Sequence, residues 1–118
     1  MAGNWSKGSG SSTMLILKLL TEKDMYGYEM IETLGERSNH VFDLKVGTLY
    51  PLLHGLVQEE YLETYSEEVN GKLRKYYHIT EKGKKHLARI IKEWQTYAGA
   101  VYELIGGRLW TRRNIWIN

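Results

Sequence analysis

The order of apolar and polar positions predicts two short helices at the start of the chain. Residues 14–20 are apolar almost throughout, which is typical of a helix surrounded by other elements, and we expect it to end near residues 22–24. A second helix is predicted after Asp24, whose carboxylate we expect to cap the first turn. Its apolar positions recur with the i, i+3, i+4, i+7 spacing of one helix face, at Gly27, Met30, Ile31 and Leu34. Because Gly27 lowers helix propensity, we expect it to let another backbone approach closely.

A third helix has the clearest apolar stripe. Pro51 lacks an N–H and is harmless only in the first turn, so we expect Thr48 to be the cap. A start at Val46 is the alternative, and Pro51 would then kink the helix. The opening turn of such a helix is the end that normally enters a DNA groove. The stripe that we expect to face the core consists of Leu49, Leu52, Leu53, Leu56 and Val57.

A β-hairpin is predicted next, because Asn70-Gly71 is the strongest short turn signal in the chain. The strands are expected near residues 61–65 and over 72–79. Alternation along the return strand puts a cation near the tip on both faces, where phosphate is reached most easily. The orientation of the acidic pair Glu67 and Glu68 is left open. One face carries Leu73, Lys75, Tyr77 and Ile79, and the other carries Lys72, Arg74, Tyr76 and His78.

The last helix is predicted to begin at the capping residue Thr80 and to run to residue 105. Its apolar positions alternate in steps of four and three, which is a heptad seam, and we interpret it as a dimerisation helix. The alternative is that the seam packs on its own domain. The predicted dimer interface consists of Leu87, Ile91, Trp94, Ala98, Val101 and Ile105.

Composition narrows the class of protein. A chain of 118 residues without cysteine fits one domain in a reducing compartment, and neither a signal segment nor a membrane span is expected, so we predict a cytoplasmic protein. The net charge is only +2, but eleven acidic residues oppose four basic ones over residues 18–68, whereas eleven basic residues oppose three acidic ones afterwards. A cationic half favours an anionic partner such as nucleic acid, although solvated lysines would give the same pattern.

Catalysis and metal binding have no support in the sequence. The four histidines lack metal-ligand spacing, and neither a glycine-rich phosphate loop nor a nucleophile elbow is present. We therefore expect no enzymatic activity, no metal and no cofactor.

Four strings of residues stand out along the chain: Tyr-Gly-Tyr-Glu at 26–29, Gly-Thr-Leu-Tyr-Pro-Leu-Leu at 47–53, Arg-Lys-Tyr-Tyr at 74–77 and Thr-Glu-Lys-Gly at 80–83. In order and spacing they resemble the PadR family of bacterial transcriptional regulators, over about residues 13–105. This resemblance implies a homodimeric winged helix-turn-helix protein of the α+β class, mainly α, with one C-terminal dimerisation helix. It also implies a repressor that leaves DNA when a small aromatic molecule binds.

The resemblance divides the chain into a flexible segment 1–12, a winged helix-turn-helix domain 13–79, a dimerisation helix 80–105 and a tail 106–118. Two departures from the family pattern occur: Lys45 stands where many relatives carry a serine-like cap, and Gly55 where a long cationic side chain is common. The residues implied to contact DNA are Tyr26, Lys45, Thr48, Tyr50 and Pro51 for the groove, and Lys72, Arg74 and Lys75 for the wing.

Trp94 on the predicted seam is the candidate platform for a planar aromatic effector, with Tyr97 and either Leu15 or Leu19 as neighbours. The alternative is that Trp94 is only a large interface residue. The expected partners are double-stranded DNA with an inverted repeat, a second copy of the chain and this effector, but no membrane. A competing function is a winged-helix dimer that binds proteins or sequesters drugs without binding DNA, and the acidic middle third favours it.

Overall fold

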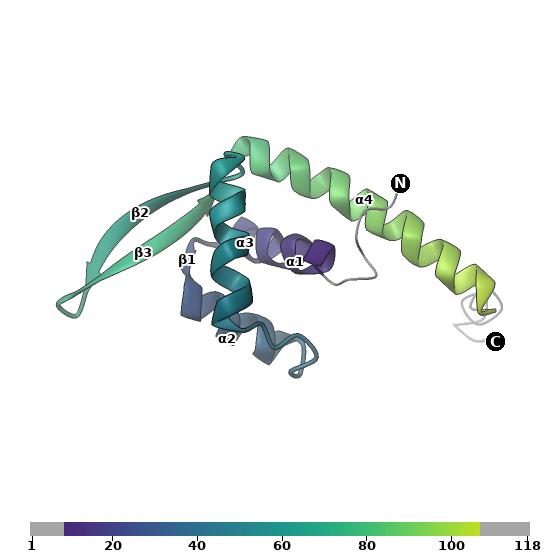
Figure 1. Ribbon diagram of the computed structural model, residues 1–118, viewed down its shortest axis with the longest axis horizontal. Helices are drawn as coiled ribbons and strands as arrows, with labels where there is room; N and C mark the ends of the chain where they lie inside the picture. Colours follow the sequence, from purple (N-terminus) through teal and green to yellow (C-terminus); the bar gives the residue numbers. More distant parts are fainter. Residues whose placement is uncertain (1–8, 107–118) are drawn as a thin grey trace.

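The computed structural model describes residues 9–106, which form four helices and one three-stranded antiparallel sheet with strand order β1-β3-β2 (Figure 1). The mainly helical α+β class is therefore confirmed. The elements in chain order are α1 Ser9–Glu22, β1 Met25–Tyr26, α2 Gly27–Arg37, α3 Val46–Gln58, β2 Leu62–Val69, β3 Lys72–Ile79 and α4 Glu81–Leu104.

The core lies where the first three helices meet the base of the sheet. Leu49 and Leu53 of α3 are fully buried against this core, which confirms the apolar stripe predicted for the third helix. The hairpin of β2 and β3 extends from the core to one side, and α4 extends to the other (Figure 1). We call this hairpin the wing. The apolar side chains buried most completely are Ile16, Leu17, Met25, Met30, Leu49, Leu53, Leu62 and Ile79.

The first helix begins earlier than the sequence predicts. Ser9 already belongs to α1, so the last residues of the segment 1–12, expected to be flexible, are helical. The helix ends at Glu22, within the predicted range. Residues 1–8 and 107–118 lie outside the described residues, and with them most of the predicted tail 106–118.

Asp24 does not cap the second helix, so that prediction is wrong. Residues 25 and 26 instead form β1, which pairs with β3 in the register Met25↔Tyr77 and Tyr26↔Tyr76. The helix starts only at Gly27, without a side-chain cap. The Asp24 carboxylate is bound to Tyr65 and His78 of the wing. A partner so distant in sequence leaves no local pattern around Asp24 by which it could be predicted.

Thr48 is not the cap of the third helix, which begins at Val46 as the alternative had it. The carbonyl oxygen of Lys45 accepts the first helical hydrogen bonds from the N–H groups of Thr48 and Leu49, at 3.0 and 2.9 Å. Pro51 therefore lies in the second turn, and the carbonyl of Gly47 receives no i→i−4 bond. The helix nevertheless continues through Pro51 to Gln58.

The wing has the predicted turn. Asn70 and Gly71 both have positive φ angles, 54° and 80°, as a type I′ turn requires. Residues directly opposite each other in an antiparallel pair point to the same face. Glu67 therefore shares a face with its partner Arg74, and Glu68 shares the other face with Leu73. Each face of the wing tip thus carries both signs of charge.

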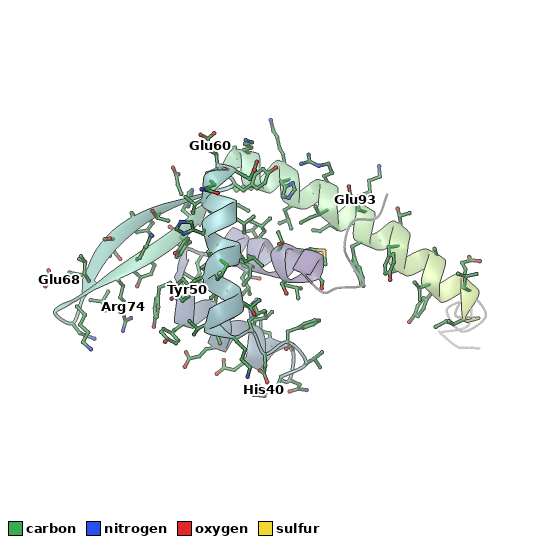
Figure 2. The ribbon with its side chains drawn as sticks, viewed as in Figure 1. His40, Tyr50, Glu60, Glu68, Arg74 and Glu93 are labelled. Atoms are coloured by element: carbon green, nitrogen blue, oxygen red, sulfur yellow. The ribbon has the colours of Figure 1, made fainter. Side chains whose placement is uncertain are left out.

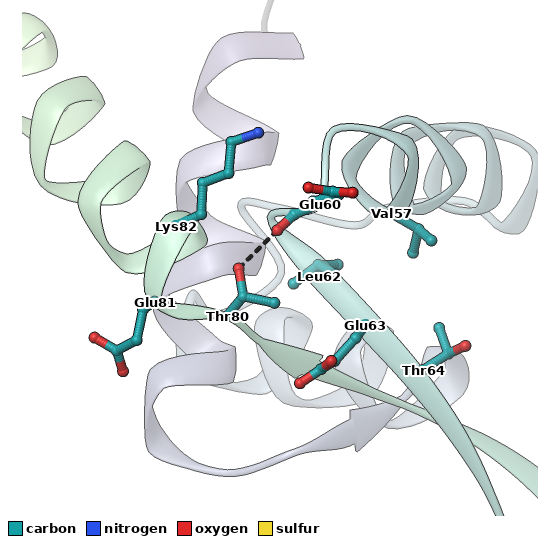
Figure 3. Close-up of a pocket in the computed structure, with 8 residues that line it drawn as sticks. All are labelled: Val57, Glu60, Leu62, Glu63, Thr64, Thr80, Glu81 and Lys82. Atoms are coloured by element: carbon teal, nitrogen blue, oxygen red, sulfur yellow. Dashed lines mark hydrogen bonds between the residues drawn. The ribbon is translucent and has the colours of Figure 1, made fainter.

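The last helix is joined firmly to the wing base. Thr80 caps it as predicted, because its Oγ1 accepts a hydrogen bond from the Gly83 N–H at 2.9 Å. The same hydroxyl donates to the carbonyl oxygen of Glu60 at 2.7 Å (Figure 3). Leu87 is buried in the core, so the first part of the predicted seam packs on its own domain. Ile91 is partly buried against the same core, and farther along the seam Val101 is 39% exposed and Ile105 72%.

The contact at Gly83 gives a stability prediction. A Cβ at this position would overlap the Tyr61 carbonyl oxygen and lie 2.8 Å from the Ile79 side chain. Gly83→Ala should therefore lower the free energy of unfolding by about 1–3 kcal/mol, despite the better helix propensity of alanine. Urea denaturation measures this effect. Gly55→Ala is the control: nothing lies within 4 Å of its added Cβ, so it should raise stability by roughly 0.5–1 kcal/mol. Equal effects of the two substitutions would contradict the packing described here.

Candidate nucleic-acid interface

A groove of about 520 Å³ lies between the wing and the starts of α2 and α3. It brings together residues that are up to 51 positions apart, from Tyr26 to Tyr77. Figure 2 shows Tyr50 on α3 and Arg74 on the wing. The groove is lined by both tyrosines and cations. The cations suit the phosphates of a nucleic acid, and the tyrosine rings suit the apolar and ring surfaces of its bases. The lining residues are Tyr26, Gly27, Tyr28, Tyr50, Lys72, Arg74, Lys75 and Tyr77.

Tyr50 reaches this groove because Gly27 has no side chain. A Cβ added to Gly27 would overlap the Tyr50 hydroxyl and lie 2.6 Å from the ring carbon that bears it. The expectation of a close approach at Gly27 is thus confirmed, but the approaching group is a tyrosine ring and not a backbone. Tyr50 remains 37% exposed, so it is held by α2 on one side and open to the groove on the other.

The wing cations lie against tyrosine rings. The guanidinium carbon of Arg74 is 4.4 Å from the centre of the Tyr26 ring, and the ammonium of Lys75 is 5.8 Å from that of Tyr77. Such contacts limit the positions of long cationic side chains while leaving the charge available. Burial, and secondarily the nearby Tyr50, raises the pKa of Tyr77, so this phenol stays neutral and adds no negative charge to the groove.

Five of the eight predicted DNA-contacting residues line the groove: Tyr26, Tyr50, Lys72, Arg74 and Lys75. The other three, Lys45, Thr48 and Pro51, are exposed at the start of α3 but are not lining residues. Sequence reasoning did not single out Gly27, Tyr28 and Tyr77 as lining residues. Tyr28 belongs to the Tyr-Gly-Tyr string that the sequence analysis singled out, but its 60% exposure at the start of α2 is known only from the structure.

A second groove, also of about 520 Å³, follows the outer half of α4. Trp94 and Tyr97 line it, with ring centres 6.0 Å apart. Leu15 and Leu19 do not. Within the single chain Leu19 is buried in the core and Leu15 packs against it. Their place beside a bound effector stays a prediction. The remaining lining residues are Ala98, Gly99, Val101, Tyr102 and Ile105.

A third hollow, of about 610 Å³, lies at the C-terminal end of α3, and Glu60, Glu63 and Glu81 contribute to its lining (Figure 3). Three carboxylates with a single cation, Lys82, give this surface an excess of negative charge, which disfavours phosphate. Within residues 9–106, no three His, Asp or Glu side chains converge as metal ligands. No helix in that range has the length and apolar content needed to cross a bilayer.

The chain is similar to known regulators throughout this region. The model of the transcriptional regulator PadR-like family matches residues 16–89. The uncharacterized protein X of Lysinibacillus sphaericus is 42% identical over 86 residues, which cover 72% of this chain and 79% of that protein.

Solved structures agree with this match. A transcriptional regulator from Clostridium thermocellum has a TM-score of 0.76 and 31% identity, covering 80% of this chain and 92% of that one. A PadR family transcriptional regulator from Eggerthella lenta has a TM-score of 0.71 and 29% identity, covering 81% and 82%. Together with the cationic groove beside α3, these matches show that the chain belongs to the PadR-like family of transcriptional regulators, which are winged-helix proteins and not enzymes.

Proposed function

We propose that this regulator binds double-stranded DNA sequence-specifically, through the opening turn of α3 and the wing. The observation that carries the proposal is the groove in which Tyr50 lies beside Lys72, Arg74 and Lys75. A helix start with exposed side chains fits the major groove and reads base edges, whereas cations on a hairpin neutralise phosphates. Lys45, Thr48 and Pro51, exposed at the start of α3, belong to the proposed reading surface.

We further propose that two copies pair through the outer half of α4. Trp94, Val101 and Ile105 are at least 36% exposed, and they form an apolar face on a helix that extends beyond its own core. Ala98 lies between them on the same seam, and Ile91 adjoins it. A second copy covers this face and places two recognition helices in a two-fold arrangement. The matching operator is an inverted repeat whose half-site centres lie roughly 34 Å apart, or a multiple of that distance.

The regulator is proposed to act in the cytoplasm as a repressor that a small planar aromatic compound releases from DNA. The support is the groove along α4, where Trp94 and Tyr97 offer ring faces at the proposed dimer seam. A compound stacked there changes how the two helices pack. The distance between the two DNA-reading surfaces depends on that packing, which gives the ligand a route to the operator.

DNA binding is tested by substitutions in the groove. Tyr50→Ala should cost about 1–3 kcal/mol of operator affinity and much less of nonspecific affinity, because Tyr50 is proposed to contact bases. Lys75→Ala should weaken both about equally, and it should reduce the slope of log affinity against log salt by about 0.9 for the lost phosphate contact. Fluorescence anisotropy over a salt series measures both quantities.

The wild-type protein is the reference for this comparison. Binding that does not depend on salt, or no binding to fragments of its own upstream region, would favour the competing role as a dimer that binds proteins or sequesters drugs. Equal losses for the two variants would contradict the proposed division between base and phosphate contacts.

Dimerisation is tested by two adjacent residues of α4. Val101→Glu puts a charge on the proposed seam and should cost about 3–5 kcal/mol of dimerisation free energy, because the carboxylate would be buried without a partner. Ala100→Glu adds the same charge to an exposed position off the seam and should leave the dimer intact. Sedimentation velocity at micromolar concentration distinguishes them. Dimers of equal stability in both variants would exclude the proposed seam.

The effector site is tested with planar aromatic dyes. Trp94→Ala should weaken dye binding by about tenfold, since stacking contributes of the order of 1 kcal/mol beyond the buried area. Isothermal titration calorimetry gives the affinity, and a competition experiment shows whether the dye displaces the operator. Dye binding that is unchanged in Trp94→Ala would place the effector elsewhere.

A further inference from the structure

The direction of the wing is only weakly determined by hydrophobic packing. Leu62 is the single buried residue of β2, and Tyr77 and Ile79 at the base are the buried residues of β3. β1 pairs with β3 only at Tyr76 and Tyr77. The outer part of the wing therefore extends beyond the core (Figure 1). Apolar burial fixes where the wing begins, but other contacts must set the angle of its outer part.

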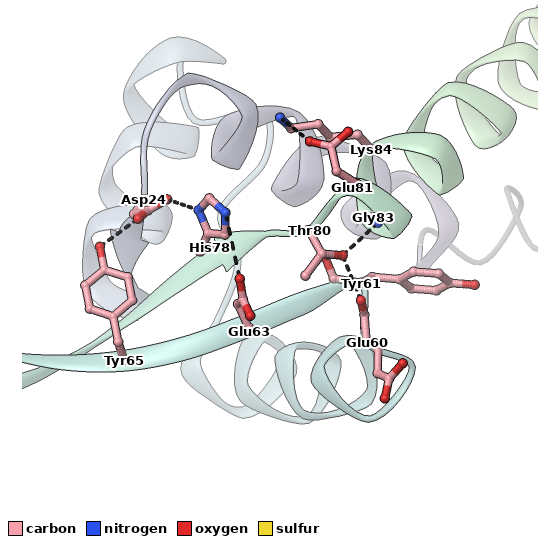
Figure 4. Close-up of polar contacts among 10 residues, drawn as sticks. All are labelled: Asp24, Glu60, Tyr61, Glu63, Tyr65, His78, Thr80, Glu81, Gly83 and Lys84. Carbon is pink, nitrogen blue, oxygen red and sulfur yellow. Dashed lines mark hydrogen bonds and ion pairs between the residues drawn. The ribbon is translucent and has the colours of Figure 1, made fainter.

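A cluster on the outer face of the sheet supplies such contacts. The Asp24 carboxylate accepts a hydrogen bond from the Tyr65 hydroxyl at 2.6 Å, and its other oxygen lies 2.8 Å from Nδ1 of His78 (Figure 4). Tyr65 belongs to β2 and His78 to β3, so one carboxylate holds both strands of the wing. Asp24 itself is fixed to the core, because the next residue, Met25, is only 2% exposed.

Stacked rings connect this carboxylate to a cation of the proposed DNA interface. The Tyr65 ring stacks on Tyr76, with centres 5.6 Å apart and planes 12° apart. Tyr76 in turn meets Tyr26 edge to face at 5.6 Å. The guanidinium of Arg74 lies over that same Tyr26 ring. Asp24, Tyr65, Tyr76, Tyr26 and Arg74 thus form one continuous series of contacts across the sheet.

The protonation states favour this arrangement near neutral pH. Burial alone would raise the pKa of Asp24, but hydrogen bonds from Tyr65 and His78 outweigh it and hold that pKa below its usual value. The hydrogen bond to Asp24, together with burial, raises the pKa of Tyr65 to about 12, so the phenol remains a donor. His78 and Asp24 side chains are still 45% and 30% exposed. Contacts this exposed add little to global stability, so their main effect is on local geometry.

We propose that Tyr65 and Asp24 are positioning residues for DNA binding, which hold the outer wing at the angle that presents Arg74 to the sugar-phosphate backbone. Neither residue needs to touch DNA. The inference rests on the proposed DNA-binding function and adds to it a device that orders the wing before DNA arrives. Pre-ordering of this kind lowers the entropy lost on binding.

The test is a double-mutant cycle. Tyr65→Phe keeps the ring on Tyr76 but removes the hydroxyl, and it should weaken operator binding by about tenfold, the size expected for a hydrogen bond to a charged group. Arg74→Ala should weaken binding as well. The double variant should bind no more weakly than Arg74→Ala alone, because Tyr65 is proposed to act through Arg74. Tyr61→Phe, which removes a hydroxyl from a ring that stacks on His86 at the wing base, is the matched control and should bind like the wild type.

A second measurement separates positioning from a general loss of stability. In DNA-free Tyr65→Phe, amide hydrogen exchange should accelerate in residues 64–76 and stay unchanged in α1 and α3. Asp24→Asn should behave in the same way. Uniform acceleration across the domain, wild-type affinity of Tyr65→Phe, or additive losses in the double variant would each overturn the positioning role. Absence of salt-dependent DNA binding by the wild type would instead overturn the proposed function itself.

Discussion

The burial of the base of β3 is the constraint on which the rest of the structure depends. Tyr77 and Ile79 are buried there together with Met25 of β1 and Leu62 of β2. This one strand pairs with both other strands, leads through Thr80 into α4, and carries the wing cations at its far end. The base of β3 cannot shift without opening the core. The positions of the groove, the wing and the last helix therefore all depend on it.

The surface around that point is divided by charge. The groove between wing and helices collects Lys72, Arg74 and Lys75, whereas the opposite end of α3 collects Glu60, Glu63 and Glu81. A net charge of only +2 therefore hides two regions of opposite sign. This distribution of charge favours the approach of a polyanion from the side of the wing and disfavours approach from the other side. Salt ions weaken the effect by screening the charges.

The last helix serves two purposes along its length. Leu87 completes the core, and Ile91 and Tyr97 still pack against that core from the side, whereas Trp94 and Val101 offer exposed apolar surface. Self-packing, one interpretation of the heptad seam, thus holds for the inner part of the helix, whereas pairing through the outer part is the proposal made above. The outer half of α4 and the wing base are connected by this one continuous helix, which Thr80 joins to the carbonyl oxygen of Glu60.

The sequence by itself determined the elements whose signals are local. The stripe on α3, the Asn70-Gly71 turn and the Thr80 cap were all predicted correctly, because each depends on residues within about one or two turns of chain. Five of the eight residues predicted to contact DNA also line the groove. Tertiary structure alone decided the partners that are distant in sequence. Asp24 binds the wing instead of capping α2, Gly27 accommodates Tyr50, and Glu67 faces the same way as Arg74. Strand pairing and side-chain contacts between distant segments leave no periodic trace along the chain, and only the fold brings these groups together.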